Sequence, residues 1–241
     1  MTEHLYNVLF RGVMSVSIPS QEQFELLTDY DTGSAYSEAY RTIYANIRFN
    51  LDKAQEKPHT LLLTMISAAS PQVVLAANVA IIAAQSGTPT ILIDADLRKP
   101  GLEQRFGLEK GAGLRDLLQA DVITPQQFQQ CLRKTFVNNL LLLSAGSDDA
   151  SEEALFSSRL PGVIASMRDY LAGMVEDKTG MIIFHSAPVL AGPDASLIGA
   201  QVEQTILAIV KGRTTRSQAK QAQEQLQRAH VNLAGIIILD K

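Results

Sequence analysis

The chain has 241 residues, of which 46% are hydrophobic and 19% are charged, and its formal net charge is −4. This length and composition predict one large globular domain with a hydrophobic core. The negative charge excludes a general attraction to nucleic acid. A single cysteine, Cys131, excludes an internal disulfide framework, and the four histidines are scattered without metal-ligand spacing.

Residues 1–33 are mixed in character and end in a turn-like Asp31-Thr32-Gly33. We expect a leader or linker here, followed by one domain over residues 34–241. The start of the chain has no basic stretch followed by a signal-like apolar core, so export is not expected. The longest apolar run, residues 73–84, is interrupted by Asn78 and is too short to cross a bilayer.

A helical pattern begins near Ser34 or Ser37, either of which can cap it, and apolar residues then recur every fourth position to Leu51. Short, continuously apolar runs follow, and such runs are typical of strands covered on both faces. These predicted strands are 61–66, 90–93, 140–143, 181–184, 206–210 and 236–239. The predicted helices between them are 74–85, which Gly87 ends, 126–135, 160–175 and 217–229. The alternation predicts an α/β fold, doubly wound, with a mainly parallel sheet of about seven strands and helices on both faces.

Several side chains have simple structural interpretations. Cys131 lies in an apolar helical stripe with Phe128, Leu132 and Phe136, which places it in the core. Three tyrosines share one face of the first helix, and we favour packing over a role as phosphate acceptors; they are Tyr36, Tyr40 and Tyr44. The last predicted helix region is basic, which favours a solvated face over a docking surface for an acidic partner or anionic lipid.

The first predicted strand, a loop at 67–73 and the following helix have the architecture of a phosphate-binding loop. Such a loop needs glycines, a lysine for the β- and γ-phosphates, and a hydroxyl for Mg²⁺. Here the lysine position is Gln72, the hydroxyl positions are apolar, Pro71 has no N–H to donate, and no glycine is present. The degenerate loop comprises Ala69, Ser70, Pro71, Gln72, Val73 and Val74.

The energetic consequence of these replacements is large. Each charge-assisted hydrogen bond that is lost is worth roughly 1.5–3 kcal/mol. Losing three or four of them lowers affinity by about a thousandfold or more. We therefore expect no tight binding of Mg²⁺-ATP in the usual mode, and no cofactor.

Two carboxylates follow the second predicted strand, in Ile91-Leu-Ile-Asp-Ala-Asp-Leu-Arg-Lys-Pro100. Asp94 and Asp96 either cap the junction between strand and loop, or hold a lone divalent cation through oxygen ligands. His185 ends another predicted strand and is interpreted as a hydrogen-bonded histidine near the core rather than a ligand.

These motifs together resemble the bacterial tyrosine autokinases, the cytoplasmic kinase domains of capsular and exopolysaccharide co-polymerase systems, which have a P-loop NTPase-like fold. The resemblance covers residues 34–241. Its most specific part is the 91–100 segment, and Phe106-Gly-Leu108 and Gly113-Leu-Arg-Asp-Leu-Leu118 continue it. By this resemblance Asp94 would be a catalytic base or metal partner, Asp96 would help hold the metal, His185 stands where the family has an aspartate, and Asp194 matches a later acid.

The resemblance also implies self-association through the first helix, Ser37-Glu-Ala-Tyr-Arg-Thr-Ile-Tyr-Ala-Asn-Ile-Arg-Phe49. The family uses a glutamate and two arginines at three-residue spacing. Glu38 and Arg41 match, Tyr44 replaces the second arginine, and Arg48 is a further basic residue. The family's phosphate-accepting tyrosine cluster has no counterpart, because no tyrosine follows Tyr170.

Two functions follow as hypotheses. The first is a catalytically inactive, autokinase-like interaction subunit in polysaccharide synthesis or export. It would be cytoplasmic, at the inner face of the membrane, and would bind a membrane-embedded chain-length regulator, an active kinase paralogue or further copies of itself. The second is an active tyrosine autokinase or ATPase that binds ATP and Mg²⁺ atypically through Asp94 and Asp96. A relative of the partition and septum-site ATPases ranks last, because the two-lysine loop of that group is missing.

Overall fold

The computed structural model describes residues 26–29, 33–51, 58–68, 72–147, 152–174 and 180–239. Their centre is a seven-stranded sheet in the order β3-β4-β2-β5-β1-β6-β7. The strands are β1 (His59–Met65), β2 (Thr90–Ala95), β3 (Leu132–Lys134), β4 (Leu140–Leu143), β5 (Met181–Ser186), β6 (Gln204–Val210) and β7 (Leu233–Leu239). All neighbouring strands pair in parallel except β3 and β4. The predicted α/β class and mainly parallel sheet are confirmed.

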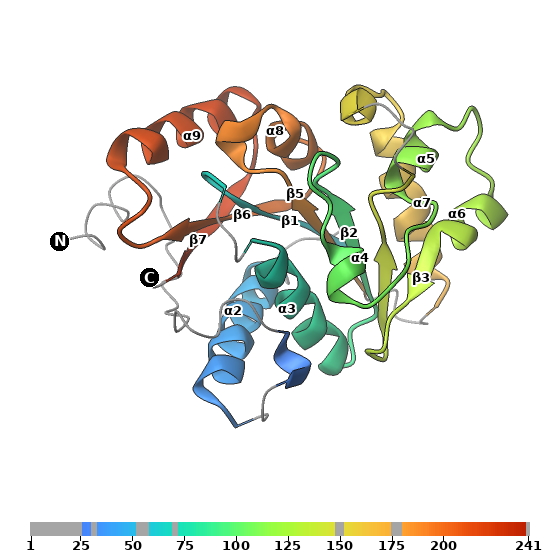
Figure 1. The fold of residues 1–241 in the computed structure, drawn as a ribbon, viewed down its shortest axis with the longest axis horizontal. Coiled ribbons are helices and arrows are strands. Elements are labelled where there is room, and N and C mark those ends of the chain that lie inside the picture. Colours follow the sequence, from blue (N-terminus) through green and yellow to red (C-terminus); the bar gives the residue numbers. More distant parts are fainter. Residues whose placement is uncertain are drawn as a thin grey trace.

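Two layers of helices cover the sheet (Figure 1). One layer contains α2 (Ala35–Leu51) and α3 (Gln72–Gln85). The other side is covered by α5 (Leu114–Gln119), α7 (Leu160–Ala172), α8 (Asp194–Gly199) and α9 (Arg216–Arg228). Shorter elements complete the fold, namely α4 (Leu102–Arg105), α6 (Pro125–Cys131) and the 3₁₀ turns Leu27–Asp29, Glu152–Phe156 and Val189–Ala191. Among the described residues, no helix is both long and apolar enough to traverse a bilayer.

The buried strands contribute side chains to two separate hydrophobic clusters, one on each face of the sheet. In β1, Leu62 faces the cluster beneath α5, α7, α8 and α9, whereas Leu61 and Leu63 face the cluster beneath α2 and α3. Successive strand residues point to opposite faces, so covering both faces requires the continuous apolarity seen in the sequence.

The first helix is attached to α3 by buried polar groups. Ser34 caps it by accepting a hydrogen bond from the Ser37 N–H at 3.1 Å. Tyr36 and Tyr40 are buried in the body of the domain and their rings meet edge to face, 5.1 Å apart. Burial also raises the pKa of Tyr40 to about 12. Packing against the body, as favoured for these tyrosines, leaves both hydroxyls away from solvent.

The structure corrects one predicted helix. The segment 126–135 is helical only as far as Cys131, and β3 begins at the next residue. Cys131 is in the core as predicted, but Phe136 lies beyond the helix and is 59% exposed. The cause is that β3 gains backbone hydrogen bonds by pairing with β4, which local apolar periodicity does not reveal.

A substitution of Asn78 tests most directly the polar contacts that attach α2 to α3. Its side-chain Nδ2 donates to the Tyr36 hydroxyl at 2.9 Å, and its side-chain Oδ1 accepts from the Leu27 N–H at 2.9 Å. We expect Asn78→Ala to lower the free energy of unfolding by about 2–3 kcal/mol, because buried polar groups lose their partners. Urea denaturation would measure the change. The exposed substitution Gln221→Ala should stay within about 0.5 kcal/mol, and an equally small effect of Asn78→Ala would contradict the assignment.

Candidate functional site

The predicted site residues lie at the carboxyl edge of the sheet, where β1, β2 and β5 end side by side. This is the edge at which open α/β sheets bind ligands. Ala69, Ser70 and Pro71 of the predicted loop lie outside the described residues. The description resumes at Gln72, the first residue of α3.

Gln72 is turned inward, onto the end of β5. It is buried, and its side-chain amide donates to the backbone carbonyl oxygen of Ser186. The position at which a phosphate-binding lysine would stand therefore holds a neutral amide that is engaged with the protein itself. The neighbouring Val74 is fully buried in the core.

The loop after β2 closes on the start of α3. A Cβ atom added to Gly101 would lie 3.2 Å from a methyl carbon of Val73, so the two residues are in direct contact. Val73 is the first of the two positions where a magnesium-binding hydroxyl would be expected. An apolar contact replaces it.

Asp94 is the buried anchor of this loop. One carboxylate oxygen accepts from the N–H groups of Gly101 and Leu102 at 2.8 and 2.9 Å, and the other accepts from the Asp96 N–H at 3.3 Å. Burial raises the pKa of Asp94 from 3.8 to about 6, although these hydrogen bonds and the charge of Arg115 act to lower it. Both oxygens are thus engaged in tying the strand to its own loop.

Asp96 and His185 form a second buried pair. His185 lies opposite Asp94 in the register of β2 and β5, and neither of its ring nitrogens has a hydrogen-bond partner among the described residues. Its pKa is lowered from 6.5 to about 4 by burial, which the charge of Asp96 offsets in part. Burial also raises the pKa of Asp96. His185 is near the core as predicted, but it makes no side-chain hydrogen bond to any residue that the structure describes.

Arg115 brings a buried cation to this edge that the sequence reasoning missed. Its guanidinium donates to the carbonyl oxygens of Leu97 and Ser147, the latter at 2.8 Å. It is only 5% exposed, and its charge lowers the pKa of Asp94. The sequence gives no clear signal of this burial, because α5 also contains Asp116 and Gln119, so that Arg115 looks like an ordinary polar residue of a short helix.

A further ion pair links the loops that follow β2 and β5. The Arg98 Nε atom lies 3.3 Å from a carboxylate oxygen of Asp194, and an Arg98 Nη atom donates to the Ala191 carbonyl at 3.4 Å. Asp194, the acid that matches the later family position, is therefore held by a residue of the 91–100 motif.

The predicted self-association residues lie apart from this edge, on α2. Glu38 and Arg41 are exposed and pair with each other at 2.6 Å. Tyr44 points inward, and its hydroxyl is 2.9 Å from that of Thr88. Arg48 also donates to the Thr88 hydroxyl, at 3.3 Å. Only Glu38 and Arg41 of the predicted set therefore face solvent at the head of the helix.

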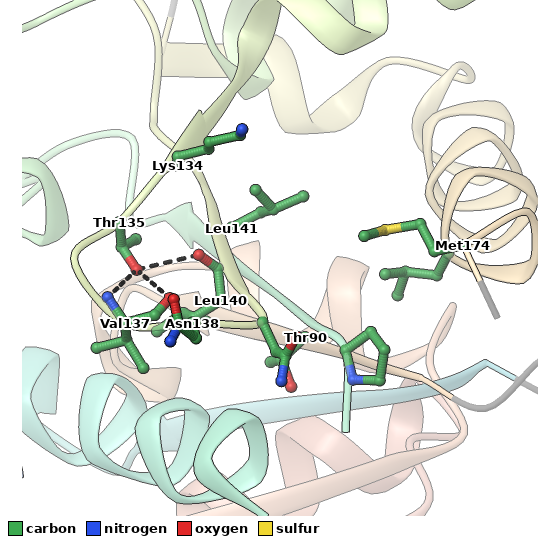
Figure 2. Close-up of a pocket in the computed structure, with 11 residues that line it drawn as sticks. Thr90, Lys134, Thr135, Val137, Asn138, Leu140, Leu141 and Met174 are labelled. Carbon is green, nitrogen blue, oxygen red and sulfur yellow. Dashed lines mark hydrogen bonds between the residues drawn. The ribbon is translucent and has the colours of Figure 1, made fainter. Parts of the chain in front are cut away.

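One small cavity lies beside the end of β1. Lined by Ser67, Ala68 and Arg213, among others, it measures about 20 Å³, which is room for about one water molecule. A larger cavity, of about 260 Å³, lies at the opposite edge, where β2 and β4 begin (Figure 2). Within the described part of the chain, no three acidic, histidine or cysteine side chains gather to hold a metal ion.

The residues described at the carboxyl edge do not fit Mg²⁺-ATP in the usual phosphate-loop mode. That mode requires a lysine, a magnesium-binding hydroxyl and free carboxylate oxygens. Gln72, Val73 and Asp94 stand in these places, and each is engaged with the protein itself. These contacts instead join the start of α3 to the end of β5, and the end of β2 to the loop that follows it.

Comparison with known proteins places the chain among named kinases. It is 32% identical over 222 residues to the tyrosine-protein kinase YwqD of Bacillus subtilis, covering 92% of this chain and 88% of YwqD. It is 31% identical over 209 residues to the tyrosine-protein kinase ptk of Acinetobacter johnsonii, covering 84% of this chain and 26% of that longer protein. No protein-family model matches the chain.

Solved structures agree with the fold. The chimerical protein CapA2B2 superposes with a TM-score of 0.78 at 22% identity, covering 99% of this chain and 98% of that one. The kinase domain of the Escherichia coli tyrosine kinase ETK gives 0.77 at 19% identity, with coverage of 100% and 95%. The cell division protein MinD of Aquifex aeolicus gives 0.57 at 16% identity over 75% of this chain and 68% of that one.

The buried titrating groups make opposite contributions to stability between pH 4 and 6. Folded Asp94, with its pKa raised to about 6, holds a proton that the unfolded chain has released, so its contribution falls as pH rises through this range. Folded His185, with its pKa lowered to about 4, lacks a proton that the unfolded chain binds, so its contribution rises with pH. Asp96 acts in the direction of Asp94.

Replacing Asp94 or His185 should therefore reveal the contribution of the other residue to the pH dependence of the free energy of unfolding. We expect Asp94→Asn to make the free energy of unfolding rise more steeply from pH 4 to 6 than in the wild type. His185→Asn should make it fall with pH over the same range. Urea denaturation at several pH values measures both slopes, and two variants with the same change of slope would show that these groups do not titrate as assigned.

Proposed function

Because the chain belongs to the family of bacterial tyrosine-protein kinases, we propose that it is a non-catalytic member that acts by binding. The proposed role is that of a regulatory subunit in capsular or exopolysaccharide synthesis and export. One relative, from Klebsiella pneumoniae, is named for its place in the cps region, and it is 26% identical over 204 residues.

The observation that carries this proposal is that the side chains of Gln72 and Asp94, at the carboxyl edge, already bind other groups of the protein. The Gln72 amide is engaged with Ser186, and both oxygens of Asp94 accept backbone N–H groups. A nucleotide would have to break these contacts without gaining a lysine or a magnesium-binding hydroxyl in return. Each lost charged contact is worth roughly 1.5–3 kcal/mol, which supports a loss of nucleotide affinity rather than a moderate weakening.

The partner is proposed from the family to which the chain belongs. A membrane-embedded chain-length regulator would provide a membrane attachment, and an active kinase paralogue would provide the catalytic activity. The protein would then work on the cytoplasmic side, at the inner face of the membrane.

An active autokinase or ATPase is the second candidate, and a specific observation favours it. The segment that contains Asp94 and Asp96 retains both carboxylates, at the end of a parallel strand, and open α/β sheets bind ligands at this edge. In that case the edge would rearrange when ATP and Mg²⁺ bind, releasing Asp94 from Gly101 and Leu102.

Calorimetry separates the two candidates. We expect no binding heat for the intact chain with Mg²⁺-ATP at about 1 mM, while YwqD under the same conditions serves as the positive control. The Gln72→Lys variant should also give no binding heat, because Val73 and the engaged Asp94 carboxylate are unchanged in it. Micromolar binding to the wild-type chain would exclude the non-catalytic function.

Self-association through α2 is proposed separately. We expect Glu38→Ala to lower the molar mass measured by light scattering, because Glu38 and Arg41 are the members of the predicted set that face solvent. Glu224→Ala, on α9, is the matched control and should leave the mass unchanged. A wild-type monomer, or equal masses for all three proteins, would exclude the α2 interface.

A further inference from the structure

A second cavity lies between α6 and α7, away from the carboxyl edge. Its volume is about 270 Å³. Two aromatic rings line it, those of Phe128 from α6 and Tyr170 from α7, whose centroids are 5.8 Å apart in an edge-to-face arrangement. Phe128 is buried and Tyr170 is half-buried, and both rings pack against the hydrophobic core.

The polar lining of this cavity has unused hydrogen-bonding capacity. Within the described part of the chain, no hydrogen bond or ion pair engages the Asp169 carboxylate, the Gln129 amide or the Tyr170 hydroxyl. By contrast, the Ser166 hydroxyl donates to the Gly162 carbonyl, and Thr124 is engaged in capping α6. None of the described residues that line the cavity is a lysine or arginine, so Asp169 gives this lining a net negative charge.

The edge of the cavity is apolar. Ile123 lines it, and the adjacent Val122 is 70% exposed, among the largest exposed fractions of any large apolar side chain described. A concave site with apolar walls and a few convergent polar groups is the usual form of a binding site. The charge and the rings indicate what would fill this one.

We propose that this cavity receives a basic side chain from an apolar segment of a protein partner. An arginine or lysine would lie against the Phe128 and Tyr170 rings, with its charge toward Asp169, while neighbouring apolar residues cover Val122. Arginine suits such a site because its planar group stacks on aromatic rings and binds carboxylates.

The class of partner rests on the proposed function. Cytoplasmic segments next to membrane spans are enriched in lysine and arginine. A membrane-embedded regulator would therefore present basic residues beside apolar ones on its cytoplasmic side, where this domain is proposed to lie. The cavity is negative and apolar, which is complementary to such a segment.

The cavity of Figure 2 provides an internal comparison. It has nearly the same volume, but the described residues that line it include Lys134 and no acidic residue, and Met174 extends into it from just beyond the end of α7. A basic peptide attracted only by shape or by exposed apolar surface would enter both cavities. One recognised by charge would enter only the cavity that contains Asp169.

The test is nuclear magnetic resonance of the full chain labelled with ¹⁵N. The probe is the capped tripeptide acetyl-Leu-Arg-Leu-amide, and the control is the same peptide with citrulline, which has a similar shape but no charge. We expect saturable shifts of the amides of residues 123–129 and 166–170 by the arginine peptide, with a dissociation constant on the order of 1 mM. Residues 134–141 should not shift.

Two variants identify the group responsible. We expect Asp169→Asn to weaken the arginine peptide about five-fold, the upper range for one exposed ion pair. Asp121→Asn is the matched control, because it removes an exposed acid from the same surface but outside the cavity. Equal binding of the citrulline peptide, equal effects of the two variants, or no shifts at all would exclude the proposal. Nucleotide calorimetry is independent of these results, so the non-catalytic function could stand if this site fails.

Discussion

The Asp94 carboxylate is the interaction on which the carboxyl edge depends. It joins the end of β2 to the first turn of α4, through Gly101 and Leu102. A buried carboxylate is costly unless its oxygens are satisfied, and here the protein backbone satisfies them. Arg115 adds a compensating charge nearby. We propose that Asp94, which the family resemblance marks as a catalytic base or metal partner, has a structural role in this chain.

The other contacts of the edge extend the same principle. Gln72 binds the end of β5, and Arg98 binds Asp194 at the start of α8. The loops that would separate to admit a ligand are joined by side chains from the same motifs that would bind it. Family membership and an intact fold are therefore compatible with a site that serves stability, and the proposed non-catalytic function follows from that combination.

Much of the fold was predictable because its signals are local. Continuous apolar runs predicted six of the seven strands, and four-residue spacing predicted α2, since these patterns follow from burial alone. β3 was missed because three residues beside α6 become a strand only through pairing with β4. The short helices α4, α5 and α8 were missed because each has six residues or fewer, too few to show a period. At the site, the residue replacements were visible in the sequence, but the hydrogen-bond partners of Gln72 and Arg115 come from distant segments and needed the fold.

The bond between Tyr44 and Thr88 has a consequence for how this protein would respond to the state of the cell. It fastens α2 to the turn that ends α3, so the helix that bears Glu38 and Arg41 is held in one position by the protein's own hydroxyls. If the carboxyl edge binds no nucleotide, as proposed, no described element would change its position with the ATP level of the cell. Its contact surfaces would be displayed equally in starved and growing cells, and the number of copies synthesised would set the strength of its effect.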